Sequence, residues 1–218
     1  MRIYLKLTKN KESIPFNYQP MLTGSLHKWI GKNDLHDNLS LYSFSWLQNA
    51  KKVKDGFDFP DGSSYFISAY DSLLIKEIIK GIQHDPEIGK GLFVKEIIIQ
   101  EDPLFNSQER FLLASPVFIK RNSEGKDIHY SFKDEKSSQY LTETLSNKLV
   151  NAGLTNQGVN VSFDTTYHSP KTKVIYYNKV GSKVNICPVK ISGTPEQIVF
   201  AWNVGIGNST GIGFGALK

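Results

Sequence analysis

Residues 72–100 read SLLIKEIIKGIQHDPEIGKGLFVKEIIIQ, and two kinds of secondary structure follow one another within them. The first part, 72–82, spaces apolar side chains three and four positions apart, as on one face of a helix: Leu74, Ile75, Ile78, Ile79 and Ile82. The last part, 92–100, is rich in β-branched residues and predicts a strand. A helix followed by a strand indicates a domain in which helices pack on a sheet.

The segments before this stretch extend the same pattern. The expected elements are a strand, a helix that ends at a glycine, and two further strands, at 2–7, 19–31, 41–47 and 64–70. Between the last two, residues 55–62 are predicted to form a polar loop. The first half is therefore predicted to have the order β-α-β-β-α-β.

The second half repeats this order more loosely. Strands are expected at 111–121 and 158–167, a hairpin pair at 173–180 and 183–193, and a short strand at 214–218. Helices are expected at 140–153 and at 194–205, where Thr194 is the N-cap. Two such units in series predict an α+β fold of two tandem ferredoxin-like (RRM-like) domains, 1–103 and 104–218, with a glycine-rich C-terminal loop.

Composition narrows the classes of function. The 218 residues carry a formal net charge of +5, which favours an acidic partner such as nucleic acid. Cys187 is the single cysteine, so neither an internal disulfide nor a thiolate metal cluster is expected, and the histidines show no metal-ligand spacing. No metal or cofactor is therefore expected. No apolar run is long enough for a membrane span and the N-terminus alternates like a strand, so we expect a cytoplasmic protein with no membrane partner.

Positive charge gathers in one window of the second half. Between Asp164 and Glu196 there is no acidic residue. The window contains lysines interleaved with a histidine and tyrosines: Lys171, Lys173, Lys179, Lys183, Lys190, His168, Tyr167, Tyr176 and Tyr177. This pattern suits a phosphate backbone with bases stacked nearby, and it equally suits a solvated hairpin edge protected by lysine. For His168, RNA contact and a solvated turn are both open.

The C-terminal stretch GIGNSTGIGFG, 205–215, contains glycines at five positions: Gly205, Gly207, Gly211, Gly213 and Gly215. It lacks the third glycine and the strand-to-helix context of a dinucleotide fingerprint, and no Gly-Lys-Ser/Thr makes it a phosphate loop of the Walker type. Two interpretations remain. The loop either offers backbone N–H groups to phosphates or lets the last helix return tightly to the sheet.

Several segments in order resemble one known family. The G-x-G and G-F-G spacing at 205–215, together with 16–30, 35–47, 85–105 and 111–121, is similar to the CRISPR repeat-cleaving endoribonucleases, the Cas-six family of RAMP proteins. The resemblance covers essentially the whole chain. It implies tandem ferredoxin-like domains, an RNA partner, and metal-independent cleavage in which a ribose 2′-hydroxyl attacks the adjacent phosphate and leaves a 2′,3′-cyclic phosphate and a 5′-hydroxyl.

Such a reaction needs a base, an acid and a positive charge, and histidine suits both proton transfers because its pKa is ordinarily ~6.5. From the residues alone, His27 late in the first helix and His36 just beyond it either converge on one phosphate or are surface histidines. The resemblance favours the first alternative. His36 matches the family's Leu-His-acid histidine, whereas His27 stands where many relatives have a tyrosine. His27 is the expected base and His36 the expected acid, although the two could exchange roles; Lys28 or Lys32 would supply the charge.

The expected function is therefore an endoribonuclease that binds CRISPR repeat RNA and cuts precursor transcripts into guide RNAs. A non-catalytic RNA-binding RAMP subunit of a CRISPR effector complex is the alternative, and a ferredoxin-like protein that serves only assembly is a third. The expected partners are repeat RNA, as precursor and as mature guide, together with effector-complex subunits and a second copy of the chain.

Overall fold

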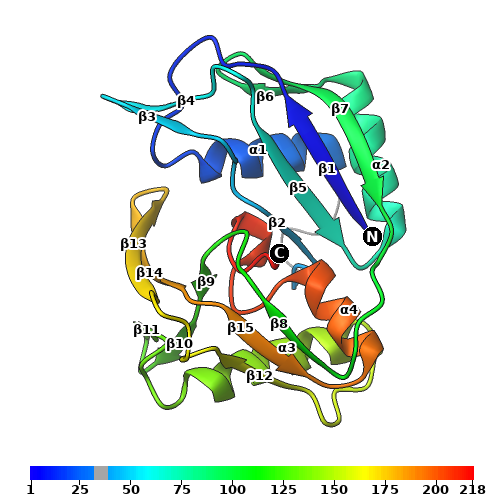
Figure 1. The fold of residues 1–218 in the computed structure, drawn as a ribbon, viewed down its shortest axis with the longest axis vertical. Coiled ribbons are helices and arrows are strands. Elements are labelled where there is room, and N and C mark those ends of the chain that lie inside the picture. Colours follow the sequence, from blue (N-terminus) through cyan, green and yellow to red (C-terminus); the bar gives the residue numbers. More distant parts are fainter. Residues whose placement is uncertain (32–38) are drawn as a thin grey trace.

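The computed structural model describes residues 1–31 and 39–218. The first half is a five-stranded antiparallel sheet in the order β2-β5-β1-β7-β6, with both helices behind one face (Figure 1). Its elements are β1 (Arg2–Leu7), α1 (Gln19–Ile30), β2 (Tyr42–Phe44), β5 (Ser64–Ala69), α2 (Ser72–His84), β6 (Glu87–Gly89) and β7 (Leu92–Gln100). Apart from the short β6, this is the predicted β-α-β-β-α-β order.

The helices of the first half bury the apolar faces that the sequence predicts. Ile75 and Ile78 of α2 are fully buried against the sheet, as is Leu26 of α1 apart from 1% of its surface. The two helices approach closely at Gly81, where an added Cβ would lie 2.3 Å from the backbone oxygen of Trp29. A side chain at this position would push α2 away from α1, so the glycine sets the distance between the helices.

One prediction in the first half is wrong. The polar segment 55–62 was expected to be a loop, but part of it belongs to a hairpin of β3 (Lys51–Val53) and β4 (Gly56–Asp58). Phe57 and Ile14 exchange two backbone hydrogen bonds, at 2.7 and 2.9 Å. This long-range bridge anchors the hairpin, and nothing local in the sequence indicates it.

The second half contains a three-stranded sheet in the order β12-β15-β8, and outside the named strands Leu113 and Leu217 form an isolated antiparallel bridge. Its other elements surround that sheet (Figure 1). In chain order they are β8 (Gln108–Phe111), β9 (Val117–Phe118), β10 (Lys120–Ser123), β11 (Lys126–His129), α3 (Ser137–Asn151), β12 (Asn160–Phe163), β13 (Lys171–Tyr177), β14 (Val180–Ile186), β15 (Val189–Ser192), α4 (Pro195–Val204) and the 3₁₀ turn η2 (Thr210–Ile212). As predicted, Thr194 caps α4 by accepting from the Gln197 N–H.

Two predicted strands of the second half are each broken at a proline. The segment 111–121 divides into β8, β9 and the start of β10, and 183–193 divides into β14 and β15 around Pro188. Proline has no N–H for a strand ladder, so the chain leaves one sheet and joins another at these points. The hairpin that results pairs β13 with β14. Its turn residues Asn178 and Lys179 both have positive φ, 46° and 71°, as a two-residue type I′ turn requires.

The two halves are docked through buried polar contacts. Arg2 of β1 is 1% exposed and donates to the backbone oxygens of Trp202 and Leu217 in the second half, both at 3.0 Å. The connection between β7 and β8 contains the predicted division at 103/104, which stays a prediction. None of the helices that the structure describes has the length and apolar character to span a bilayer.

Candidate nucleic-acid interface and active site

A pocket of about 460 Å³ lies where α1, β2, the β13–β14 hairpin and η2 meet. It is lined by residues from both halves of the chain: Pro20, Thr23, Gly24, His27, Ser40, Tyr42, Tyr177, Asn178, Gly211 and Ile212. The tip of the hairpin points toward α1 in Figure 1. The pocket therefore joins the three features that the sequence singled out: a histidine of the first helix, the basic hairpin and the glycine-rich loop.

α1 contributes His27 and a strip of small residues to the pocket. Pro20, Thr23, Gly24 and His27 are spaced three and four apart, so they share one face of the helix. Among residues 1–31 and 39–218, nothing lies within 4 Å of a Cβ added at Gly24, and Gly24 lines the pocket together with the half-buried His27. No described side chain therefore fills the space at Gly24.

Lys28 is held outside this pocket. Its Nζ forms an ion pair with Asp85, at 2.8 Å, and also donates to the backbone oxygen of Glu87. The hydrogen bond from Lys28 is the largest cause that lowers the pKa of the Asp85 carboxyl. A role for Lys28 in charge stabilisation would require this ion pair to break, and it stays a prediction. The other two predicted catalytic residues, Lys32 and His36, lie outside the described residues.

Ser40 and Tyr42 contribute hydroxyl groups to the pocket, and neither was predicted as a site residue. Burial raises the pKa of the Tyr42 phenol, against a smaller lowering by its hydrogen bond with Ser40. Tyr42 therefore stays protonated near neutral pH and keeps a hydroxyl donor for a ligand. A Cβ at Gly211 would lie 2.3 Å from Ser40 Oγ, so glycine is needed for the loop to approach these hydroxyls. The signal in the sequence was weak, because Ser40 and Tyr42 become neighbours of His27 only through the fold.

Much of the glycine-rich loop is packed against the protein itself. The N–H groups of Gly205, Gly213 and Gly215 donate to the backbone oxygens of Ala201, Thr210 and Pro116, at 2.9, 3.2 and 2.8 Å. A Cβ at Gly207 would lie 2.5 Å from the Phe118 oxygen. At these four positions the loop matches the interpretation of a tight return to the sheet. Phosphate contact through the N–H groups of Gly205, Gly213 and Gly215 would require existing hydrogen bonds to break.

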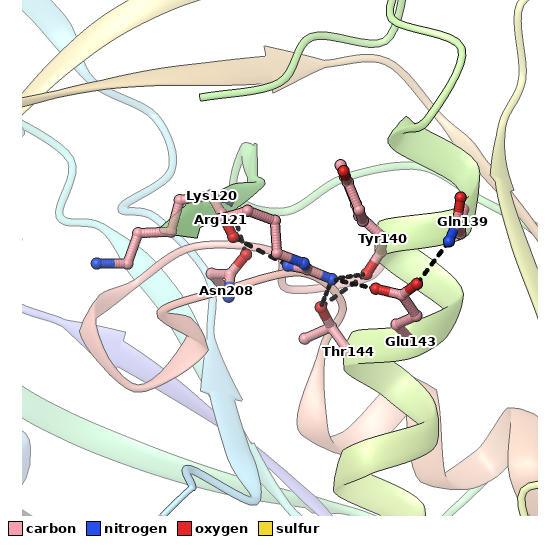
Figure 2. A network of polar contacts seen from close by, with 7 residues as sticks. All are labelled: Lys120, Arg121, Gln139, Tyr140, Glu143, Thr144 and Asn208. Atoms are coloured by element: carbon pink, nitrogen blue, oxygen red, sulfur yellow. Dashed lines mark hydrogen bonds and ion pairs between the residues drawn. The ribbon is translucent and has the colours of Figure 1, made fainter. Parts of the chain in front are cut away.

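The loop is also tied to the neighbouring strand and helix. Asn208 accepts a hydrogen bond from the Lys120 N–H at 2.9 Å and donates its own N–H to the Phe118 oxygen. Arg121, the residue after Lys120, is directed at α3 in Figure 2, where it contacts the Tyr140 oxygen, Glu143 and Thr144. Of the five predicted glycines, Gly211 lines the pocket, on a loop anchored on both sides.

The hairpin residues predicted to bind RNA are exposed but divide between two faces. Side chains alternate along a strand, so Lys171, Lys173 and Tyr177 share one face of β13 and Tyr176 lies on the other. Lys183, opposite Val174, belongs to the Tyr176 face. Tyr177 lines the pocket and lies on the same face of β13 as Lys171 and Lys173.

Other predicted residues lie elsewhere. His168 is exposed beside Tyr167, with ring centroids 4.7 Å apart, and is not among the residues that line the pocket. Lys190 pairs with Asp164 at 3.0 Å. Among residues 1–31 and 39–218, no three His, Cys, Asp or Glu side chains gather as a metal site.

Comparison with known proteins identifies the family of this chain. A family model described as CRISPR associated protein Cas6, C-terminal, matches residues 99–218, more than half of the chain. A search of curated proteins found no match. A solved structure described as a Cas6-related gene from Pyrococcus furiosus is 21% identical with a TM-score of 0.85, covering 100% of this chain and 97% of that chain.

Two further solved structures show the same likeness. One described as an RAMP protein binding different RNA substrates is 20% identical with a TM-score of 0.85, covering 100% of this chain and 98% of that one. A Cas6 product complex is 10% identical with a TM-score of 0.71, over 100% of this chain and 99% of that one. These matches confirm the predicted fold of two tandem ferredoxin-like domains. The family match over residues 99–218 shows that the chain belongs to the Cas6 family of CRISPR-associated proteins.

Proposed function

We propose that this chain is a metal-independent endoribonuclease that binds CRISPR repeat RNA and cleaves precursor transcripts into guide RNAs. The observation that carries the proposal is the pocket in which His27 shares one space with the Ser40 and Tyr42 hydroxyls and the tip of an exposed basic hairpin. Family membership supports it, and so does the likeness in fold to a Cas6 product complex.

In the proposed reaction His27 removes the proton from the ribose 2′-hydroxyl next to the scissile phosphate. The deprotonated oxygen attacks phosphorus, the bond to the 5′-oxygen breaks, and a 2′,3′-cyclic phosphate forms. An acid must then protonate the leaving 5′-oxygen, and His36 is the residue we assign to that step, with the reverse assignment of the two histidines still open. A positioned acid or base contributes roughly 10²–10⁴-fold to the rate.

The rest of the pocket binds and orients the RNA. The hydroxyl of neutral Tyr42 donates a hydrogen bond to a phosphate oxygen, and Ser40 supplies a second hydroxyl beside it. Tyr177 offers an aromatic ring for stacking, and Lys171 and Lys173 attract the backbone from the same face of the hairpin. Lys28 or Lys32 neutralises the charge that develops on the phosphate.

The proposal is tested with purified protein and repeat RNA in excess EDTA. We expect cleavage to continue, with product ends that carry a cyclic phosphate and a 5′-hydroxyl. Within the same experiment, His27→Ala should slow cleavage about 10²–10⁴-fold because the base is lost, while RNA affinity changes little. His84→Ala is the matched control, since this exposed histidine ends α2, outside the pocket.

Two results would contradict the proposal. Cutting that depends on an added divalent ion would rule out the metal-independent mechanism. An unchanged cleavage rate in His27→Ala would remove the assigned base.

One observation favours the non-catalytic alternative, an RNA-binding RAMP subunit. The described residues that line the pocket include neither lysine nor arginine, and Lys28 is occupied by Asp85. A binding subunit would shift repeat RNA on a gel and leave it intact over long incubation, whereas the proposed enzyme would yield discrete products.

A further inference from the structure

Lys148, on α3, is a buried lysine, and no acidic side chain of the described residues forms an ion pair with it. Its residue exposure is 2%, and its Nζ donates to the backbone oxygens of Val204 and Gly205, at 3.1 and 3.4 Å, and to the Thr210 hydroxyl oxygen at 2.9 Å. Burying an ammonium group is costly unless its protons find acceptors. As an ammonium group Lys148 has three N–H donors for these three acceptors, so its charged form is satisfied only while all three stay in place.

All three acceptors belong to one short segment. Val204 is the last residue of α4, where the backbone oxygens have no partner within the helix and carry the negative end of its dipole. Thr210 begins η2. A single side chain from α3 therefore bridges the end of α4 and the start of η2, and it fixes the span of the glycine-rich loop between them.

The segment that Lys148 holds leads directly into the pocket. Gly211 and Ile212, the two residues after Thr210, line the same space as His27. On the side of the first half, Trp46 Nε1 donates to the Gly213 oxygen at 2.7 Å. Gly211 is so close to Ser40 that even a Cβ would collide, so small movements of η2 change the pocket directly.

We infer that Lys148 is a positioning residue. Its amine holds residues 204–210 from the side of α3, so that Gly211 and Ile212 stay at the position in the pocket wall, relative to His27, that RNA cleavage requires. This inference rests on the proposed function. A methionine would fill nearly the same space, so the contribution specific to lysine is its hydrogen bonds to the loop.

The kinetic test compares wild type with Lys148→Met under single-turnover conditions. We expect the cleavage rate at saturating protein to fall about 10–100-fold, because small misplacements at a reacting centre cost that much, while the RNA dissociation constant stays within about threefold. A lysine that only stabilises the domain would leave the rate unchanged at temperatures where the variant is folded.

A second measurement monitors the conformation of the glycine-rich loop in the absence of RNA. Trp46 has an indole N–H resonance that reports its hydrogen bond to Gly213, and Trp46→Phe assigns that resonance. We expect it to shift in Lys148→Met. Leu141→Ala is the matched control, because it removes a fully buried side chain two turns earlier on α3 and should lower stability without shifting the resonance or slowing cleavage.

The outcomes separate this inference from the proposed function. The role of Lys148 would be overturned if folded Lys148→Met cleaved RNA at the same rate as wild type, or if its Trp46 resonance were not shifted. If Lys148→Met does not fold, Thr210→Val decides, because it removes one of the three acceptors and should produce a smaller change of the same kind. A wild-type protein that does not cut RNA contradicts the proposed function, and the Trp46 resonance then decides the Lys148 inference alone.

Discussion

The amine of Lys148 lies 2.9 Å from the Thr210 hydroxyl, and its hydrogen-bond partners are two backbone oxygens and that hydroxyl. Burial, with no compensating charge, lowers the pKa of Lys148 to about 7. In the unfolded chain the same group titrates near its ordinary value of ~10.4. The side chain that holds the loop therefore also links the stability of the fold to pH.

The sign of this linkage gives a prediction. Between pH 7 and about 10 the unfolded state holds one proton more than the folded state at Lys148, so this group makes the free energy of unfolding rise with pH, by at most about 1.4 kcal/mol per unit. Below pH 7 the group is charged in both states and contributes no slope. Urea unfolding of wild type and Lys148→Met at pH 7, 8, 9 and 10 measures this.

We expect the difference in unfolding free energy between the two proteins to move in favour of wild type as pH rises. Other titrating groups, such as Cys187, whose pKa burial raises to about 11, are present in both proteins and cancel. Parallel pH profiles would contradict the linkage.

Single residues differ in how well the sequence predicts their place in the structure. His27 could be found because its helix has a clear apolar face, which places the ring at the edge of the core. Tyr42 reaches the pocket through tertiary contacts alone. Lys148 looks like an ordinary helix lysine in LSNKLVN, and only the arrival of α4 and η2 buries it. Cys187 is buried.

The β13–β14 hairpin is the element that carries the accessible charge. Its type I′ turn brings Asn178 to the pocket, and strand alternation places Lys171 and Lys173 on the face of Tyr177. Lys171, Lys173, Lys179 and Lys183 are exposed, and no ion pair involves them in the part of the chain that the structure describes. RNA contact through these lysines stays a prediction, and a solvated hairpin edge stays the alternative.

Neutralising one face of this hairpin should weaken RNA binding in a way that depends on salt. Each phosphate contact with single-stranded RNA contributes about −0.7 to the slope of log K against log salt, so Lys171→Gln with Lys173→Gln should make the slope shallower by about 1.4. Titrations by fluorescence anisotropy at several salt concentrations measure it. The double variant Lys76→Gln with Lys80→Gln removes the same charge from α2 and should leave the slope unchanged; equal effects of the two variants would mean that net charge alone drives binding.

Whole elements were predictable where local chemistry marks their ends. Thr194 and Gln197 form a capping box, so α4 begins where expected, and Gly31 follows the last residue of α1. The strand expected at 111–121 is broken at Pro116, and the path of the chain from there depends on long-range contacts, such as the hydrogen bond from the Gly215 N–H to the Pro116 oxygen. The β3–β4 hairpin was missed for the same reason, since its anchor is Ile14.

At the scale of the whole molecule, the pocket exists only while the two halves stay docked, since α1 and β2 come from one half and the hairpin and η2 from the other. Arg2 lies at the centre of this docking. Its guanidinium stacks between the rings of Phe66 and Trp202, 3.7 and 3.5 Å from their centroids, and donates to Ser68 Oγ besides the two backbone oxygens of the second half. Neither the charge pattern nor the periodicity of RIYLKL indicates that its arginine is buried.

Arg2→Met should therefore destabilise the whole chain. The substitution keeps an apolar stem but leaves the oxygens of Trp202 and Leu217 buried without this donor, which should lower the free energy of unfolding in urea by about 2–5 kcal/mol. Lys6→Met is the matched control on the same strand, because Lys6 pairs with Glu96 at the half-exposed surface and such pairs contribute at most about 1 kcal/mol. Equal stability of the two variants would show that the halves do not depend on Arg2. The predicted larger loss in Arg2→Met would mean that a residue outside the pocket lining stabilises the fold in which the two halves form that pocket.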